Sequence, residues 1–414
     1  MSAAIDTTPD AASPASDWRS AADVPWRSAD AHRPLELFAT CPQGLESLLA
    51  DELAELGGRQ VTADSAGASC IGDWDCAVRL NRESRLASRV LLLLAQGPYR
   101  NDKDIGRLAA TVPWDFVLEP RMSLRVDTRA RRAKVRSLNM VTLRIKDAVV
   151  DRLREVSGDR PDVDTRSPDV RLMAFVDEHR ALIYLDLSGE SLFKRGWRGR
   201  DDKGAAPLKE NLAAALPLLA GWTAGAPLLD PFCGSGTIAI EAAQRIAAIE
   251  AGGARRFGFE SLPGYRPAQA PAANHNSPRP RQGHVVRPAG TSVFASDIDP
   301  KAVGTARANA QRAGVPAAGI GFKVADVRSL QPPRGLVPGW IVTNPPYGER
   351  LESLGNDANM LALGRHLRSA FAGWTLAWLT SDRQLPGRLG LRPRRRVPVM
   401  NGALDCRLFV FDLG

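Results

Sequence analysis

The sequence predicts an α/β protein whose C-terminal half is a doubly wound, mostly parallel sheet and whose N-terminal half consists of smaller α+β units. Its 414 residues are too many for one ordinary hydrophobic core, so two or three domains are expected. From residue 226 onward, strand-like apolar runs alternate with helix-like segments, as in parallel sheets with crossover helices. Before residue 190, alternating runs around polar turns indicate hairpins instead.

Residues 1–33 are rich in Ala, Ser, Asp and Pro without apolar periodicity, so they are expected to be a disordered tail. A first α+β unit is predicted over residues 34–98, beginning with a strand. Leucines at helical spacing then predict a helix that starts after Gly44 and ends at a pair of glycines. A strand over residues 67–74 and a helix over residues 79–95 complete this unit.

A second α+β unit is predicted over residues 99–190. It begins its regular structure with a strand from Met122 and continues with an amphipathic helix. Ser137 or Asn139 can cap that helix, and Gly158 can end it. Two alternating runs around the polar turn "DEHR" then predict a hairpin.

A run of basic residues with no acidic one surrounds the start of this helix. In a chain with a net charge of +9, it favours contact with RNA or DNA over a merely solvated face. The run comprises Arg129, Arg131, Arg132, Lys134, Arg136, Arg144 and Lys146. The candidate RNA-binding residues are Arg129, Arg131, Arg132, Lys134, Arg136, Lys194 and Arg195.

The C-terminal domain is predicted over residues 207–414, after a Gly- and Arg-rich linker at 191–206. It is expected to open with a helix in which Pro207 takes the first helical position. The Pro-rich residues 262–290 carry almost no apolar pattern and are expected to be a flexible surface insertion.

Polar residues at the ends of successive predicted strands indicate a ligand site, because such sheets bind ligands beyond the carboxyl ends of their strands. The first strand runs into "DPFCGSGT", where Gly234 and Gly236 let a ligand approach the backbone before a helix begins. The second ends in Asp297, which can accept hydrogen bonds from both hydroxyls of a ribose. The third ends in Asp326, which can accept from an adenine amino group, and the fourth in Asn344.

Simpler interpretations compete with parts of this pattern. A dinucleotide-dependent dehydrogenase could use the glycine-rich turn, but the third glycine of GxGxxG is absent and Asp-Pro precedes the turn. Asp299, followed by Pro300, is expected to cap a helix rather than bind a ligand. Asp326 alone could equally be a helix cap or a turn residue.

The fourth strand runs into "NPPY", which can continue neither as helix nor as strand. Pro345 and Pro346 remove two backbone donors and fix φ, so the turn presents the Asn344 amide, the Pro345 carbonyl and the Tyr347 ring. The two oxygens could bind the N–H groups of a planar amine and aim its lone pair, while the ring stacks on an extruded base. The candidate catalytic residues are therefore Asn344, Pro345, Pro346 and Tyr347.

These motifs, in this order, resemble class I S-adenosylmethionine-dependent methyltransferases that act on a planar nitrogen. The resemblance implies a Rossmann-like domain, S-adenosyl-L-methionine as cofactor and no metal. It places "DPFCGSG" at the methionine side, Asp297 at the ribose and Asp326 near the adenine. The implied cofactor-binding residues are Asp230, Pro231, Cys233, Gly234, Ser235, Gly236, Asp297, Ile298, Asp326, Val327 and Asn344.

The stretches "LFATCPQGLESLLADEL", "LDLSGESLFKRGWR", "APLKENLAAAL" and "NGALDCRLF" extend the likeness. Residues 35–414, outside the insertion, resemble the bacterial THUMP-domain 23S rRNA guanine-N2 methyltransferases. The resemblance implies a ferredoxin-like part at 34–98, an RNA-binding THUMP domain at 99–190 and a class I methyltransferase domain at 207–414. Many relatives carry a second methyltransferase domain at the C-terminus, which is not expected in this chain.

Three alternatives remain open. Methylation of tRNA would keep the chemistry and change the RNA, and the catalytic loop does not discriminate between the two. Adenine N6 in DNA or a glutamine side chain shares the target geometry but does not explain an RNA-binding first half. A non-catalytic RNA-binding assembly factor belongs to another class, and the intact Asp297, Asp326, Gly236 and Asn344 argue against it.

Composition limits the setting. Five cysteines, an odd number without a CxxC pair, disfavour a disulfide framework or zinc site and favour a reducing cytoplasm. The longest aliphatic run, residues 90–95, is too short to span a bilayer, and no secretion signal is expected. A cytoplasmic monomer whose partner is 23S rRNA or its precursor particle, alternatively tRNA, is expected.

Overall fold

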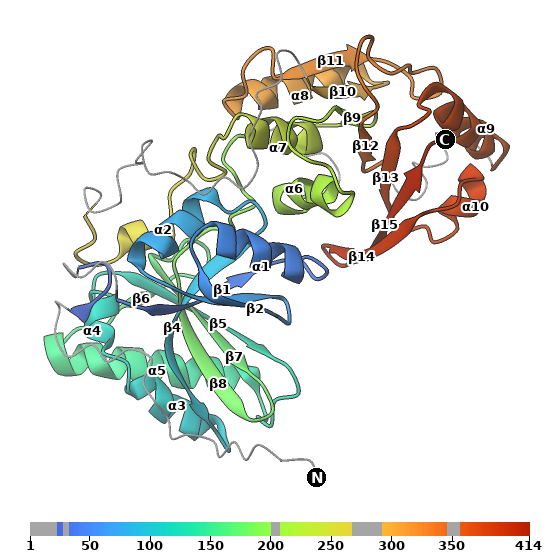
Figure 1. Ribbon diagram of the computed structural model, residues 1–414. Helices are drawn as coiled ribbons and strands as arrows, with labels where there is room; N and C mark the ends of the chain where they lie inside the picture. Colours follow the sequence, from blue (N-terminus) through green and yellow to red (C-terminus); the bar gives the residue numbers. More distant parts are fainter. Residues whose placement is uncertain (1–22, 28–32, 200–207, 267–291, 346–356) are drawn as a thin grey trace.

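A computed structural model describes residues 23–27, 33–199, 208–266, 292–345 and 357–414. Within these ranges, the N-terminal half forms an eight-stranded sheet and the C-terminal half a seven-stranded sheet (Figure 1). The predicted α/β class is confirmed. Among the described helices, none combines the length and the apolar character that crossing a membrane requires.

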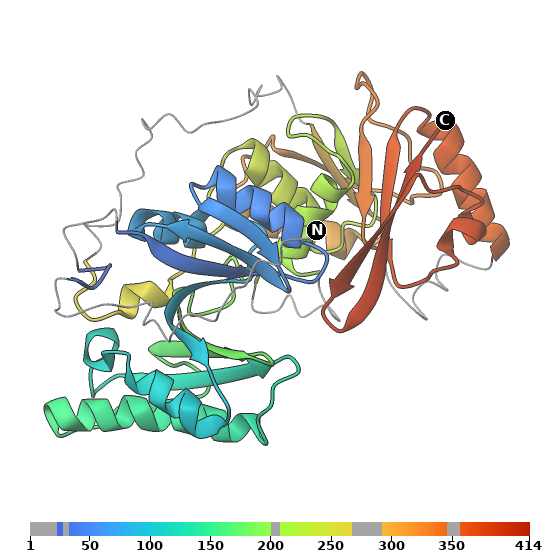
Figure 2. The same cartoon turned by 60° about the horizontal axis from the view of Figure 1, so that its bottom comes forward.

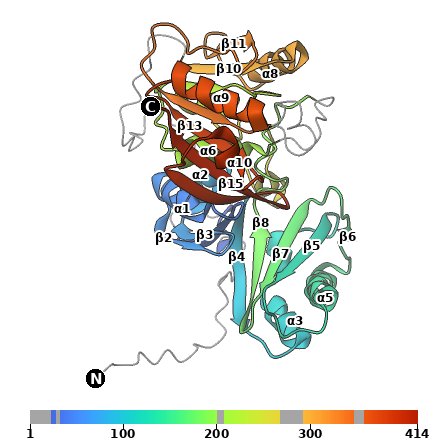
Figure 3. The ribbon, with the colours of Figure 1, turned by 90° about the vertical axis from the view of Figure 1, so that its right-hand side faces the viewer.

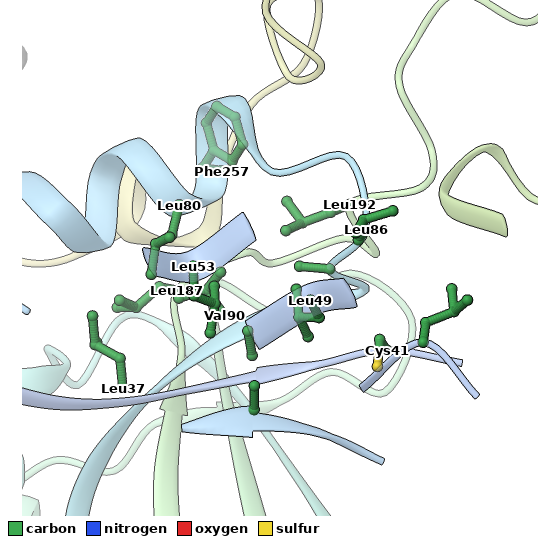
Figure 4. Packing of buried hydrophobic residues seen from close by; sticks show 14 of the residues in the cluster. Leu37, Cys41, Leu49, Leu53, Leu80, Leu86, Val90, Leu187, Leu192 and Phe257 are labelled. Atoms are coloured by element: carbon green, nitrogen blue, oxygen red, sulfur yellow. The ribbon is translucent and has the colours of Figure 1, made fainter. Parts of the chain in front are cut away.

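The eight-stranded sheet joins two α+β units through its central strand β4 (Arg89–Pro98). This strand pairs antiparallel with β1 (Leu35–Thr40) on one side and with β8 (Arg180–Asp186) on the other. In the first unit, Leu49 and Leu53 point from their helix into the core above the strands (Figure 4). The other elements of this unit are α1 (Glu46–Glu55), β2 (Arg59–Asp64), β3 (Gly67–Gly72) and α2 (Trp74–Glu83).

The helix predicted over residues 79–95 is wrong in its second half, where the chain forms β4. Leu92 and Leu94 pack into the main core, whereas Leu91 and Leu93 pack into a separate cluster. A strand buried on both faces shows no apolar–polar alternation, so its sequence looks the same as that of a buried helix.

The second unit confirms the predicted helix and hairpin. Helix α5 (Leu138–Ser157) ends at Gly158, whose φ of 80° lies in the left-handed region, and β7 (Val170–Val176) pairs antiparallel with β8. Helices α5 and α3 (Asp102–Ala110) lie together on one face of the sheet (Figures 2 and 3). The remaining elements are α4 (Trp114–Val117), β5 (Ser123–Ala130) and β6 (Asp162–Val163).

Part of the segment expected to be a disordered tail is packed. Val24 and Trp26 are buried, and the Trp26 indole nitrogen donates a hydrogen bond to the Pro263 carbonyl at 3.1 Å. The Trp26 and Trp74 rings contact each other, with centroids 5.7 Å apart. Burial of a large aromatic side chain stabilises an ordered segment even where polar residues surround it in the sequence. Of the predicted tail, residues 23–27 and Arg33 are described, and the others lie outside the described residues.

The seven-stranded sheet has the order β11-β10-β9-β12-β13-β15-β14. Its strands are β9 (Leu228–Asp230), β10 (Val293–Asp297), β11 (Ile320–Val324), β12 (Trp340–Thr343), β13 (Thr375–Thr380), β14 (Arg395–Asn401) and β15 (Leu404–Asp412). The first five strands in this spatial order are parallel, and β15 is antiparallel to both of its neighbours. The predicted mostly parallel sheet is thus confirmed, and its strand order reverses between β9 and β12.

The helix predicted to start at Pro207 begins later. Lys209 holds an extended backbone with ψ of 141° in the N-cap position, so the first helical residue is Glu210, while Pro207 is outside the described residues. Of the predicted insertion, only residues 262–266 are described, and Leu262 among them is buried. The helices of this domain are α6 (Glu210–Leu219), α7 (Thr237–Ile246), the 3-10 helix η2 (Gly258–Ser261), α8 (Pro300–Arg312), α9 (Asp357–Ala370) and α10 (Leu385–Leu389).

A buried cluster of charges, which we call the Glu241 cluster, joins the two halves of the molecule. It consists of Arg85 from the first unit, Arg195 from the segment after β8, and Glu241 of α7. The Arg85 Nη1 lies 3.0 Å from Glu241 Oε2, and the Arg195 Nε lies 3.1 Å from Glu241 Oε1. The Arg195 guanidinium also donates to the Arg85 carbonyl at 2.7 Å. The position of α7 is therefore tied to the N-terminal sheet.

The junction is also closed by apolar and backbone contacts. Leu192 and Phe257, which follow the eight-stranded sheet in the sequence, complete the core of the first unit (Figure 4). The Met400 N–H donates to the Gln43 carbonyl at 3.1 Å, which joins β14 to the turn after β1. A side chain at Gly44 would lie 2.4 Å from the Pro398 carbonyl oxygen, so this close approach requires glycine.

Candidate functional site

Three of the predicted site residues lie at one edge of the seven-stranded sheet. Strand β9 lies between β10 and β12, and all three run parallel. Asp230 is the last residue of β9, Asp297 is the last residue of β10, and Asn344 directly follows β12. The carboxyl ends of these three strands adjoin the point where the strand order reverses, which is where doubly wound sheets bind ligands (Figure 1).

The glycine-rich turn between β9 and α7 is fastened to the neighbouring strand. The Cys233 N–H donates to the Ser296 carbonyl at 2.9 Å. Gly234 and Gly236 have φ of 50° and 86°, and a Cβ at Gly236 would lie 2.9 Å from the Ala306 side chain. Both glycines are therefore needed for this turn, which brings the N-terminal amides of α7 to the sheet edge. We call residues 233–237 the glycine loop.

Asp297 connects the glycine loop to the next helix. Its Oδ2 accepts from the Gly234 N–H at 3.0 Å, and its Oδ1 accepts from the Asp299 N–H at 3.1 Å. Each carboxylate oxygen has a further lone pair with which to accept from a ligand hydroxyl. Asp299 caps α8 by accepting from the Lys301 N–H at 2.9 Å, with Pro300 at the first helical position, which confirms its predicted structural role.

Ile298, adjacent to Asp297, is 63% exposed. An aliphatic side chain this open, beside a half-buried carboxylate, provides apolar surface for one face of a flat ring. The side chain of Val327, by contrast, is buried in an apolar cluster, so only its backbone is available to a ligand.

Asp326 follows β11 and already has a partner. The Arg328 Nε donates to its Oδ2 at 2.9 Å, and the Arg328 N–H donates to its Oδ1 at the same distance. The side-chain hydrogen bonds from Arg328 hold the pKa of Asp326 below its ordinary value. The carboxylate therefore stays charged, and a ligand amino group would share it with Arg328.

Asp230 is buried beneath the site rather than directed into it. Its Oδ1 accepts from the Thr343 hydroxyl at 2.8 Å and from the Phe232 N–H at 3.2 Å. These bonds tie the start of the glycine loop to the last residue of β12. Cys233 is also buried, and burial raises the pKa of its thiol strongly, which agrees with a packing role.

The titration of Asp230 gives a test of this tie. Burial raises the pKa of Asp230 from 3.8 to about 7, so the fold favours the protonated carboxyl. The contribution of Asp230 to the free energy of unfolding should therefore fall as the pH rises from about 4 to about 7, by up to about 1.4 kcal/mol per pH unit. Asp230→Asn keeps an oxygen acceptor but does not titrate, and we expect its stability relative to wild type to grow over this range in chemical denaturation. The exposed control Asp159→Asn should follow wild type, and a difference between Asp230→Asn and wild type that is constant with pH would contradict the assignment.

The described part of the predicted catalytic turn is short. Asn344 is half-buried and Pro345 is buried, directly after β12. Pro346 and Tyr347 are outside the described residues, so their predicted roles remain predictions.

The predicted RNA-binding residues divide into two groups. Arg129, Arg131, Arg132, Lys134 and Arg136 are all exposed, and Lys194 is exposed beside Glu190. Lys134 lies 3.3 Å from Glu178, an exposed pair that leaves it accessible. The prediction for Arg195 is wrong, because this side chain is 2% exposed and bound to Glu241. The Arg195 guanidinium instead pairs with Glu241 in the buried cluster that joins the two halves of the molecule.

The sequence interpretation missed Thr343, Arg198 and Asn309. Thr343 fixes Asp230, while Arg198 and Asn309 bind Ser235 of the glycine loop. The only local signal was the pair of arginines at 195 and 198 around a tryptophan, in a segment interpreted as a plain linker.

The described residues hold no group of three or more His, Cys, Asp or Glu side chains arranged to bind a metal ion. The groups gathered at the sheet edge are instead carboxylates, backbone amides and an apolar side chain. Such a set suits an organic ligand that carries hydroxyls, an anionic end and a flat ring.

Residues 195–409, more than half of the chain, match a family model described as RMKL-like, methyltransferase domain. The seven-stranded sheet and the site at its edge thus form a methyltransferase domain. The chain belongs to this RMKL-like methyltransferase family. Two further models match ahead of it: an RlmL ferredoxin-like domain over residues 36–91 and a THUMP domain over residues 99–186.

Individual relatives agree with this assignment. The chain is 41% identical over 388 residues to the ribosomal RNA large subunit methyltransferase K/L of Syntrophotalea carbinolica, covering 92% of this chain and 54% of the relative. It is 40% identical over 390 residues to the protein of the same name from Chromohalobacter salexigens, with 92% and 53% covered. The chain therefore spans about half the length of the curated relatives it matches.

Solved structures share the fold over most of the chain. The crystal structure of SMU.472 complexed with SAH has a TM-score of 0.78 at 25% identity, covering 92% of this chain and 98% of that one. TrmN from Thermus thermophilus has a TM-score of 0.66 at 28% identity, with 92% and 100% covered.

Proposed function

We propose that this protein transfers the methyl group of S-adenosyl-L-methionine to the exocyclic N2 of a guanine in 23S rRNA. One observation carries the proposal. Asn344 and Pro345 lie at the same carboxyl edge of the parallel strands as the glycine loop, which is bound to Asp297. The rRNA methyltransferase names of the relatives and the SAH complex of the similar structure support the choice of substrate and cofactor.

The residues present fit this cofactor. The amides at the start of α7 suit its carboxylate, the free lone pairs of Asp297 suit the ribose hydroxyls, and Ile298 with Asp326 suits the adenine. The cofactor supplies a methyl group on a sulfonium, which is already a good leaving group. The protein therefore needs to provide orientation more than acid–base catalysis.

Guanine N2 is a poor nucleophile because its lone pair is delocalised into the ring. The Asn344 side-chain oxygen and the Pro345 carbonyl can accept hydrogen bonds from the two N–H groups of N2. These bonds localise the nitrogen lone pair and direct it at the methyl carbon. As the N–C bond forms, the C–S bond breaks, and the extra proton on N2 passes to an acceptor or to water. The target base has to leave its helix to reach this edge.

The N-terminal half is proposed to hold the RNA. We assign residues 34–98 to the ferredoxin-like part and residues 99–190 to the THUMP domain, ahead of the methyltransferase domain at 207–414. The exposed basic residues from Arg129 to Arg136 lie at the end of β5 and before α5, in the proposed THUMP domain. Positive side chains in such a stretch bind phosphates.

A triple variant with Gln at positions 131, 132 and 134 is expected to bind RNA more weakly and with a flatter salt dependence, because it lacks the positive charges of Arg131, Arg132 and Lys134. Each lost phosphate contact should reduce the slope of log K against log salt by roughly one unit, measured by fluorescence anisotropy at several salt concentrations. A triple Gln variant at the other end of α5 and beyond, at Arg154, Arg160 and Arg166, carries the same charge change and should keep the wild-type slope. Equal slopes in all three proteins would mean that residues 131–134 do not contact phosphates.

Labelled S-adenosylmethionine and total RNA from cells lacking the gene test the substrate. We expect label in 23S rRNA after size fractionation, and precursor particles from the same cells are the substrate to test next if naked RNA takes no label. Label in tRNA would keep the chemistry and change the substrate. No transfer to any RNA together with no cofactor binding in calorimetry would favour a non-catalytic RNA-binding assembly factor, whereas cofactor binding without transfer to naked RNA would point to a precursor particle as the substrate.

A further inference from the structure

The segment that follows β8, residues 187–199, is fixed against the rest of the protein along its length. The Arg255 guanidinium donates to the carbonyls of Ser191 and Glu190, each at 2.6 Å. Arg195 enters the Glu241 cluster described above, and Trp197 is buried. Arg198 follows immediately, and its side chain is directed toward the glycine loop.

The Arg198 guanidinium spans the base of that loop. Its Nη1 donates to the Ser235 hydroxyl at 3.2 Å, and its Nη2 donates to the Thr237 hydroxyl at 3.0 Å. The same Nη2 donates to the Leu208 carbonyl at 2.8 Å, and Nε pairs with the Glu210 carboxylate at 2.5 Å. One planar cation thus connects the start of α6 to both ends of the three-residue stretch from Ser235 to Thr237, where α7 begins.

A second set of hydrogen bonds closes a ring around Ser235. The buried Asn309 side chain donates to the Ser235 carbonyl at 3.1 Å. Arg312 donates to the Asn309 side-chain oxygen, and its Nε donates to the Trp197 carbonyl at 2.8 Å. The ring therefore runs from the segment before Arg198, through α8, to Ser235, and back through Arg198.

We infer that Arg198 is a positioning residue, which holds the glycine loop in its ligand-receiving conformation before the cofactor binds. The inference rests on the proposed function of that loop. A loop with two glycines in the left-handed region is intrinsically flexible, so ordering it only on binding would weaken affinity. Arg198 acts from the side of Ser235 and Thr237, while Asp297 holds Gly234.

Arg198→Lys tests this role because lysine keeps the charge beside Glu210 but cannot bind both hydroxyls as a planar fork. We expect the Kd and KM for S-adenosylmethionine to rise by about 10-fold, as for the loss of one to two hydrogen bonds. The value of kcat at saturating cofactor should stay within about 2-fold, because no group at the acceptor base has changed. A merely structural role would lower the melting temperature and the active fraction without this split between KM and kcat.

Two further variants make the test specific. Arg255→Lys makes the same chemical change at a residue that binds the segment 187–199 through its backbone carbonyls and whose described hydrogen bonds do not include the glycine loop, and it should leave the cofactor Kd unchanged. Ser235→Ala removes one of the two hydroxyls that Arg198 binds, so its effect on the Kd should not add fully to that of Arg198→Lys. If Arg198→Lys fails to fold, Ser235→Ala carries the test alone, with an expected rise in Kd of about 3-fold or more.

Calorimetry separates the possible failures. If wild type binds the cofactor and either Arg198→Lys or Ser235→Ala leaves the Kd unchanged, the role of Arg198 is overturned while the proposed function stands. Fully additive effects of the two substitutions on the Kd would have the same meaning. No cofactor binding by wild type would overturn the proposed function and this inference with it.

Discussion

Replacing Asn344 by Ala is expected to lower methyl transfer by at least about 10²–10³-fold, because the target amine loses an acceptor that orients its lone pair. The affinity for S-adenosylmethionine should stay within a few-fold, since the glycine loop and Asp297 are bound to each other independently of Asn344. Single-turnover transfer and calorimetry measure the two effects separately.

Asn344→Asp is the matched variant, because it retains oxygen acceptors of similar size at the same position. We expect it to keep more transfer activity than Asn344→Ala. A parallel loss of cofactor binding and transfer in Asn344→Ala would show that this residue supports the cofactor site rather than the acceptor base.

Replacing Glu241 by Ala is expected to destabilise the protein by about 3–5 kcal/mol, because it leaves Arg85 and Arg195 buried without a counter-charge. Burial alone would raise the pKa of Glu241, but the Arg195 and Arg85 guanidinium groups lower it below its ordinary value. The stabilisation is therefore present above the ordinary pKa of a glutamate and is lost as the pH falls through the lowered value. Urea denaturation at neutral and acidic pH measures both effects.

The exposed pair of Glu155 and Arg152, with nitrogen and oxygen 3.4 Å apart, provides the control. Glu155→Ala should change stability by less than about 0.5 kcal/mol. A similarly small effect of Glu241→Ala would mean that the two arginines find water or other partners, and that the junction does not depend on this carboxylate.

The strand-end residues could be predicted from the sequence because their placement follows from local pattern alone. Asp297 and Asn344 each terminate an apolar run, and parallel strands bring such ends to one edge wherever the strands pair. Asp299 was identified as a cap for the same reason, since Pro300 follows it. Local chemistry was enough at these positions.

Long-range contacts explain the errors. Nothing near Arg195 in the sequence distinguishes it from a surface arginine, because its partner Glu241 is 46 residues away. Trp26 lies in a polar stretch, and its hydrogen-bond acceptor Pro263 is 237 residues away. Strand β4 was mistaken for helix because both of its faces are covered, which removes the alternation that marks a strand. Arg198 was missed because nothing near it in the sequence identifies the glycine loop as its partner.

Nucleoside analysis of the methylated RNA tests N2-guanine transfer most directly. Purified protein, S-adenosylmethionine and unmethylated large-subunit RNA or its precursor particle would be incubated, and the digested product analysed by mass spectrometry. We expect N2-methylguanosine at one position of 23S rRNA, and its absence with Asn344→Ala. Methyl groups found on another atom, such as adenine N6, would contradict the proposed transfer.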